Sequence, residues 1–192
     1  MRTGIFGGTF DPVHVGHLAV AASAHAALGL DRLLLVVANE PWQKSGVVVT
    51  PAAVRYEAAA AAVADLEIDG LAASDVELRR GGPSFTIDTV EQLRSKDAAG
   101  SLFLVVGHDV VQSLDTWHRV EELKRLVTLA VVSRPGTRGE VCLPGWKVRA
   151  VEVPQIDVSS SAIRRRVAAG LPVDGLVPAA AMRIYRADGG YP

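Results

Sequence analysis

The sequence predicts an α/β fold of the Rossmann-like, doubly wound type, with a parallel sheet in three α/β/α layers. Two observations support this prediction. Apolar runs rich in β-branched residues alternate along the chain with segments of helical periodicity, as in repeated βαβ units. Continuous apolar runs such as residues 33–37, Leu-Leu-Leu-Val-Val, fit strands that are covered on both faces. A small helical portion is expected at the C-terminus, from about residue 155 to residue 192.

Six apolar, β-branched runs are predicted to be strands. They are Arg2–Phe6, Arg32–Ala38, Ala73–Leu78, Leu102–Val106, Thr128–Ser133 and Lys147–Val153.

Seven segments with helical periodicity lie between and after these strands. Pro51 and Pro178 are expected at the first helical position, where the missing N–H of proline has no helical partner, and Thr50 is the expected N-cap before Pro51. The predicted helices are Gly16–Leu28, Pro51–Ala64, Thr86–Ser95, Asp109–Leu114, Val120–Leu126, Ser160–Ala169 and Pro178–Tyr185.

The composition fits one globular domain over residues 1–192. The chain is long enough to bury a core, and 49% hydrophobic and 21% charged residues are ordinary proportions. No internal repeat or low-complexity linker divides it. The sequence leaves open whether the chain assembles as a homo-oligomer.

Charge and patterning exclude several classes of partner. A net charge of −1 supplies no basic excess for nucleic acid or for a membrane surface. No apolar run approaches a membrane span and no secretory signal pattern is present, so the cytoplasm is the expected compartment. The lone Cys142 excludes an intramolecular disulfide and is expected to be a small, at least half-buried thiol.

The segment Gly7–His17, Gly-Gly-Thr-Phe-Asp-Pro-Val-His-Val-Gly-His, is the strongest sign of function. It joins the first predicted strand to the first predicted helix, so backbone N–H groups and a helix N-terminus meet where an anion can bind. His14 and His17 are three residues apart and can point the same way. The segment is neither a Walker loop nor a Gly-x-Gly-x-x-Gly turn. It indicates polyphosphate chemistry, and the structural alternative is a tight turn with two exposed histidines.

Four further segments follow predicted strands and are expected to converge with this turn. In doubly wound sheets, ligands bind beyond the carboxyl ends of the strands. The segments are Asn39–Lys44, Gly107–Asp109, Ser133–Gly136 and Ser159–Ser161. Two of them have structural alternatives: Lys44 as a solvated surface lysine, and Ser159 as an ordinary N-cap before a basic helix face.

Two of these segments resemble a known family. Gly7–His17 resembles the signature of the nucleotidyltransferase superfamily with His-x-Gly-His motifs and, more narrowly, of bacterial nicotinate mononucleotide adenylyltransferases. Residues 158–164, Val-Ser-Ser-Ser-Ala-Ile-Arg, are similar to the family's Ile-Ser-Ser-Thr-x-Ile-Arg, with Val158 replacing Ile and Ser161 replacing Thr. The resemblance covers essentially the whole chain. It implies transfer of the adenylyl group of ATP to nicotinate mononucleotide in NAD biosynthesis, giving deamido-NAD and pyrophosphate by direct in-line attack.

The resemblance also implies roles for residues at the ATP side. His17, and after it His14, are the expected transition-state stabilisers, with no covalent enzyme intermediate. Mg²⁺ is expected to be held mainly by ATP phosphates, without protein ligands. The expected ATP-binding residues are Gly7, Gly8, Thr9, Phe10, His14, Gly16, His17, Gly107, Asp109, Arg134, Ser159, Ser160, Ser161 and Arg164.

For the acceptor, residues 83–89 resemble the family's Ser-Tyr-Thr-x-x-Thr stretch, with Phe85 where Tyr is commoner. Thr86, at a helix start, suits the nicotinate carboxylate, and a Thr/Asp capping arrangement is its structural alternative. Trp117 matches the family position that stacks on the pyridine ring. The expected acceptor-binding residues are Asn39, Lys44, Phe85, Thr86, Asp109 and Trp117.

Three alternatives stay open at this point. Nicotinamide mononucleotide differs from the expected acceptor only in the group that Thr86 would meet. Phosphopantetheine adenylyltransferases share the His-x-Gly-His turn but lack the long first signature and the pairing of Thr86 with Trp117. A non-catalytic nucleotide-binding module is disfavoured because both histidines are present. The sequence assigns no role to Arg55, Trp42 or Trp146, and does not show whether residues 42–49 and 83–85 close over substrate.

Overall fold

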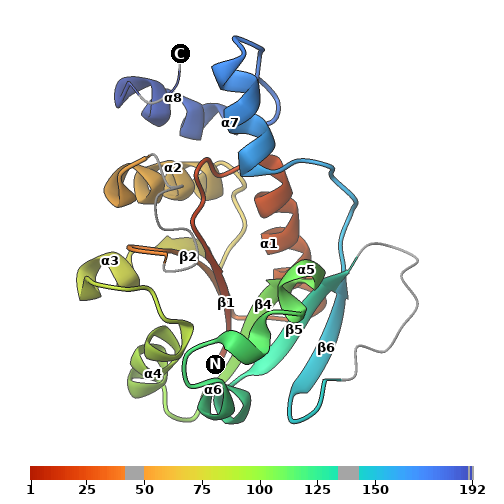
Figure 1. Ribbon diagram of the computed structural model, residues 1–192. Coiled ribbons are helices and arrows are strands. Elements are labelled where there is room, and N and C mark those ends of the chain that lie inside the picture. Colours follow the sequence, from red (N-terminus) through yellow and green to blue (C-terminus); the bar gives the residue numbers. More distant parts are fainter. Residues whose placement is uncertain (42–49, 134–142, 190, 192) are drawn as a thin grey trace.

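The computed structural model describes residues 1–41, 50–133, 143–189 and 191 (Figure 1). Its centre is a six-stranded sheet in the order β3-β2-β1-β4-β5-β6, with every pair of neighbours parallel. The strands are β1 (Arg2–Gly8), β2 (Arg32–Val37), β3 (Leu71–Ser74), β4 (Ser101–Gly107), β5 (Thr128–Ser133) and β6 (Lys147–Glu152). This is the doubly wound order, so the predicted fold class is confirmed. The order reverses between β1 and β4, and a ligand crevice is expected at that point.

Helices cover both faces of the sheet. Strand β4 shows the reason, because Phe103 and Val105 join one core cluster while Leu102, Leu104 and Val106 join the other. The first cluster packs against α1, α2, α7 and α8, and the second packs against α3, α4 and α6. The helices are α1 (Val15–Ala27), α2 (Ala52–Ala64), α3 (Val76–Arg80), α4 (Thr86–Lys96), α5 (His108–Val111), α6 (Val120–Leu126), α7 (Ser160–Ala168) and α8 (Ala179–Ala187), with a 3₁₀ turn η2 (Leu114–Thr116).

One predicted strand is wrong in its second half. The segment Ala73–Leu78 contains the end of β3 and the start of the short helix α3. Val76 and Glu77 are both buried there, so the apolar spacing that looks like a strand comes from a helix of five residues. Such a helix is too short for its period to be recognised in the sequence.

One predicted helix is interrupted. Residues 109–114 divide between α5 and η2, and the hydroxyl of Ser113 donates to the carbonyl of Val110 at 2.9 Å. A serine that bonds to the backbone in this way competes with helical hydrogen bonds. Pro51 and Pro178 are N-caps of α2 and α8 instead of first helical residues, so Thr50 is not the cap of α2.

The C-terminal helices lie at one end of the sheet. Figure 1 shows α7 and α8 above the carboxyl ends of the central strands, with α8 beside α2. Tyr185 of α8 is fully buried, and Ile163 of α7 is fully buried as well. None of the described helices combines the length and the apolar character that a membrane crossing requires.

Candidate active site

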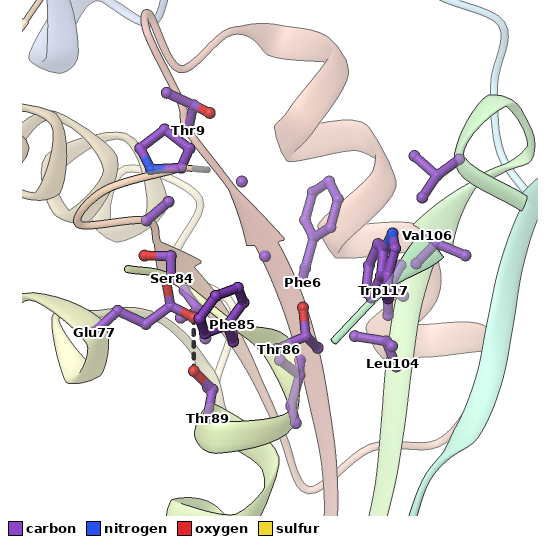
Figure 2. A pocket seen from close by; sticks show the side chains of 18 of the residues that line it. Phe6, Thr9, Glu77, Ser84, Phe85, Thr86, Thr89, Leu104, Val106 and Trp117 are labelled. Atoms are coloured by element: carbon purple, nitrogen blue, oxygen red, sulfur yellow. Dashed lines mark hydrogen bonds between the residues drawn. The ribbon is translucent and has the colours of Figure 1, made fainter. Parts of the chain in front are cut away.

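Two cavities meet at the carboxyl ends of β1 and β4, where the strand order reverses. Cavity A has a volume of about 340 Å³ and lies between these strands, the start of α4 and residues 117–118 (Figure 2). Cavity B has a volume of about 460 Å³ and lies between the β1–α1 turn and the start of α7. Both are lined by Phe6, Gly7, Gly8, Thr9 and Asp109. Parts of three of the four segments predicted to converge with the β1–α1 turn line these compartments: Pro41, Gly107 with Asp109, and Ser159–Ser161. Ser133 lines neither cavity, and residues 134–136 lie outside the described part of the chain.

The β1–α1 turn, residues 9–14, is held through its backbone. Four consecutive carbonyls, those of residues 9–12, each accept a hydrogen bond from a side chain on another helix. The donors, in that order, are Arg55 of α2, Tyr185 of α8, and Arg164 and Ser160 of α7. The Tyr185 hydroxyl also accepts from the N–H of Val13 at 3.0 Å. Three helices thus determine the position of this turn.

Arg55, for which the sequence suggested no role, is a buried cation behind the turn. Only 1% of its surface is exposed, and its guanidinium donates to the carbonyls of Thr9 at 2.7 Å, Thr50 at 3.0 Å and Asn39 at 3.3 Å. Burial lowers the pKa of Arg55 from its ordinary value, and the nearby Asp11 opposes that shift. Arg55 therefore joins the turn after β1 to the segment after β2.

His14 and His17 form a stacked pair that lines cavity B. Their ring centroids are 3.6 Å apart with an interplanar angle of 23°. The backbone N–H of His14 donates to Nδ1 of His17 at 3.2 Å, so the proton of a neutral His17 ring is on Nε2. His14 is 6% exposed, and burial lowers its pKa to about 4. His14 is therefore neutral near pH 7, and the expectation that both rings face one site is confirmed.

Glycine is required for reasons of space at Gly8 and Gly16, which flank this turn, whereas a Cβ at Gly7 would meet nothing within 4 Å. A Cβ at Gly16 would lie 2.9 Å from Cγ1 of Val158 and 3.1 Å from Nδ1 of His14. A Cβ at Gly8 would lie 2.8 Å from the ring of Phe10. Gly16 lines neither cavity, so its visible role is to let α1 approach the segment before α7. At Gly107, which lines cavity A, a Cβ would collide with the carboxylate of Asp109.

The second signature forms the opposite wall of cavity B. Ser159 is the N-cap of α7, and its Oγ accepts from the N–H of Ala162 at 3.2 Å. Ser160 donates to the carbonyl of Pro12 at 2.9 Å, and Arg164 donates to the carbonyl of Asp11 and to Ser161 Oγ at 3.4 Å. All four side chains of this set line the cavity. The structural alternative for Ser159, an N-cap, is thus correct and coexists with its place in the site.

Cavity A contains most of the residues predicted for the acceptor. Phe85, Thr86, Asp109 and Trp117 line it, and Figure 2 shows Phe85 and Trp117 on opposite sides. Thr86 is the first residue of α4. The ring of Phe85 lies 4.6 Å from that of His118, centroid to centroid.

Three residues that the sequence reasoning missed also line cavity A. They are Glu77, Ser84 and His118. Thr89 donates to Glu77 at 2.6 Å, and Arg80 lies 3.8 Å from the same carboxylate oxygen. His118 directly follows Trp117, and this adjacency was the available signal for it. Glu77 lies on the unpredicted helix α3, so no signal pointed to it.

Asn39 does not line either cavity. Its backbone N–H donates to Ser84 Oγ at 2.9 Å and its Nδ2 to the carbonyl of Gly82 at 3.1 Å. It thereby attaches the segment after β2 to the segment before α4. Trp146 packs at the edge of the second core cluster. Lys44, Arg134, Trp42, Cys142 and the segment 42–49, whose closure the sequence left open, lie outside the described residues.

Comparison with known proteins gives consistent results. Residues 5–166 match the family model described as cytidylyltransferase-like. A Saccharopolyspora erythraea protein named "Probable nicotinate-nucleotide adenylyltransferase" is 41% identical over 179 residues, 92% of this chain and 83% of that protein. A Thermus thermophilus protein of the same name is 43% identical over 181 residues, 94% of each chain.

Among solved structures, Plasmodium falciparum nicotinic acid mononucleotide adenylyltransferase complexed with NaAD is similar, with a TM-score of 0.82. The match covers 98% of this chain and 96% of that one, at 15% sequence identity. At this identity the likeness shows a shared fold.

The burial of His14 predicts a pH-dependent stability. The folded-state pKa of about 4 lies below the unfolded value of 6.5, so the unfolded chain binds a proton first as the pH falls. Between pH 7.5 and pH 5, the wild type should lose about 2 kcal/mol more free energy of unfolding than His14→Gln. Urea denaturation of both proteins at the two pH values measures this difference. Equal losses would mean that His14 titrates normally in the folded protein.

The hydroxyl of Tyr185 makes two hydrogen bonds, so removing this one oxygen atom should lower the stability of the protein clearly. Tyr185→Phe leaves the carbonyl of Phe10 and the N–H of Val13 without this partner, which should cost about 1–3 kcal/mol of unfolding free energy. Tyr191→Phe is the matched control, because the neighbouring Tyr191 ring packs on Tyr185 at 5.0 Å and its hydroxyl forms no hydrogen bond with the described residues. Denaturant unfolding of both variants provides the comparison. A control variant as destabilised as Tyr185→Phe would contradict the assignment.

Proposed function

The chain belongs to the cytidylyltransferase-like family, and we propose that it is a nicotinate-nucleotide adenylyltransferase of NAD biosynthesis. The observation that carries this proposal is the pair of cavities with a common floor at Gly7–Thr9. A transfer between two nucleotides needs two adjacent compartments that open onto the position of the transferred phosphorus. We assign ATP to cavity B and nicotinate mononucleotide to cavity A.

The reaction needs positioning and charge stabilisation. A phosphate oxygen of nicotinate mononucleotide attacks the α-phosphorus of ATP, and the bond from that phosphorus to the bridging oxygen breaks. Pyrophosphate leaves with the electron pair, and deamido-NAD is formed. Because the attacking phosphate is already ionised, no protein base and no protein nucleophile are required.

Cavity B supplies donors for the charge that develops. We infer that His17, with its proton on Nε2, donates to an oxygen of the transferred phosphoryl group, and that His14 holds the His17 ring and is the second donor. Ser159–Ser161 and Arg164 face this pair across the cavity, where hydroxyl and guanidinium groups suit the outer phosphates. Asp109 lines both cavities and suits a ribose hydroxyl.

Cavity A suits a pyridine ring with an anionic substituent. Trp117 presents an aromatic surface, and Thr86 stands at the N-terminus of the eleven-residue helix α4, which favours a carboxylate. Gly7, Gly8 and Thr9 line the same cavity, so the phosphate of a mononucleotide bound there can lie at the common floor. Phe85 offers no hydroxyl, so polar recognition falls to Thr86, to backbone amides and to the other polar side chains of cavity A, such as Ser84 and His118.

Magnesium is proposed to enter with ATP. Mg²⁺ generally keeps several waters and is held through substrate phosphates, so we propose that phosphate oxygens and water bind it here. Among the described residues, no group of three or more His, Cys, Asp or Glu side chains could hold a metal ion. Asp109, at the junction of the cavities, is the carboxylate best placed to lie near such an ion. When bound, the ion neutralises charge on the triphosphate. The cytoplasmic location stays a prediction.

Pyrophosphate release tests the reaction directly. The pure protein is incubated with ATP, Mg²⁺ and one acceptor: nicotinate mononucleotide, nicotinamide mononucleotide or phosphopantetheine. We expect rapid release with the first and little with the other two. Release only with phosphopantetheine would overturn the proposal, and release only with nicotinamide mononucleotide would overturn the assignment of Thr86.

Replacing His17 tests the donor assignment. His17→Ala should lower turnover by about 10²-fold or more, the scale expected when one transition-state donor is lost. His25→Ala is the control, because His25 is on the same helix and lines neither cavity. Circular dichroism checks that both variants are folded. A His17→Ala enzyme with turnover close to that of wild type would refute the role of His17.

A further inference from the structure

We propose that Arg119 is a positioning residue for the acceptor: it keeps the two walls of cavity A at a fixed separation. One wall is the start of α4, with Phe85, Thr86 and Thr89, and the other is residues 117–118. Arg119 comes directly after residues 117–118 in the chain and is the N-cap of α6. This inference rests on the proposed function, because cavity A is taken as the acceptor site.

The guanidinium of Arg119 connects the two walls. It donates to both oxygens of Glu91 on α4, at 3.1 and 2.7 Å, and to both oxygens of Glu122 on α6, at 2.8 and 2.5 Å. Asp88, also on α4, lies 3.8 Å from the same group. Paired donation to two carboxylates fixes direction as well as distance. Residues 28 positions apart in the chain are thus held together next to the cavity.

The backbone of Arg119 is adapted to this task. Its φ is +52°, in the left-handed region, which costs a non-glycine residue about 1 kcal/mol or more. The carbonyl of the same residue accepts from the N–H groups of Glu122 and Leu123, so the chain turns sharply into α6. This turn directs the side chain of Arg119 towards α4 immediately after His118, whose ring contacts Phe85.

Charge makes the wall separation depend on Arg119. A single exposed ion pair contributes little, but here one cation stands between carboxylates on two helices. Without the cation, Glu122 on α6 would face Asp88 and Glu91 on α4, and like charges repel. Loss of Arg119 therefore removes an attraction and leaves a repulsion between the walls. None of these four residues lines either cavity. The consequence should fall on cavity A, because Arg119 directly follows Trp117 and His118, and because Asp88 and Glu91 lie on α4 with the lining residues Thr86 and Thr89.

The test compares steady-state constants for the two substrates. Arg119→Gln should raise the KM for nicotinate mononucleotide about five-fold, while kcat and the KM for ATP stay within about two-fold of wild type. Arg125→Gln is the control, since it removes the same charge from α6 and Arg125 forms no ion pair among the described residues. The double variant Arg119→Gln/Glu122→Gln should regain part of the affinity, because it removes the repulsion.

Two results would overturn the proposal. One is an unchanged KM for nicotinate mononucleotide in Arg119→Gln, and the other is an equal rise in both KM values, which a general loss of structure would produce. If Arg119→Gln does not fold, Glu91→Gln removes the α4 side of the contact and should raise the same KM with a smaller factor. Added salt should raise the acceptor KM more steeply in wild type than in Arg119→Gln. If wild type is inactive with nicotinate mononucleotide, the proposed reaction is refuted. The role of Arg119 is then tested separately, by comparing the acceptor KM of Arg119→Gln with that of wild type for the acceptor that does react.

Discussion

The backbone of the β1–α1 turn is the constraint on which the site depends. Its carbonyls at residues 9–12 accept hydrogen bonds from side chains of α2, α7 and α8. These hydrogen bonds fix the position of the turn relative to the three helices. A catalytic side chain is effective only when the residues around it hold it in the productive geometry. Here the support includes a buried arginine, Arg55, whose desolvation is offset by three carbonyl acceptors and a nearby Asp11. The C-terminal helices thus support the turn that lines cavity B, the proposed phosphate site.

The sequence predicted this site where its residues are contiguous in the chain. The stack of His14 on His17 and the serine N-cap of α7 follow from local spacing, and both are present. Arg55 and Tyr185 act on backbone carbonyls 46 and 175 positions away, and such contacts leave no pattern in the sequence. Asn39 was expected in the acceptor site because it follows β2, but its amide is used to hold Gly82. The position of a polar side chain at a strand end could be predicted, whereas its hydrogen-bond partner could not.

The same distinction applies to the fold. Five of the six strands were predicted within about two residues. Four of them, β1, β2, β4 and β5, are central strands made of largely apolar runs, whereas β6 is a mostly exposed edge strand. The edge strand β3 has four residues and only one is fully buried, so its pattern merged with that of α3. The helix that the sequence missed carries Glu77, and this carboxylate enters cavity A with Thr89 as its partner. An error of a few residues in an edge element therefore concealed a polar group of the candidate site.

Buried hydrogen bonds and packing support cavity B, whereas exposed ion pairs lie beside cavity A. Cavity B depends on buried contacts of the turn, including the neutral His14, whose low pKa follows from its burial. A neutral donor attracts ground-state phosphates less than a cation does, and it still stabilises charge that develops at the transition state. Cavity A is proposed to depend on the exposed carboxylates around Arg119, which can be replaced without opening the core. Under the proposed assignment, acceptor affinity can therefore be adjusted through surface charges without altering the buried contacts of cavity B.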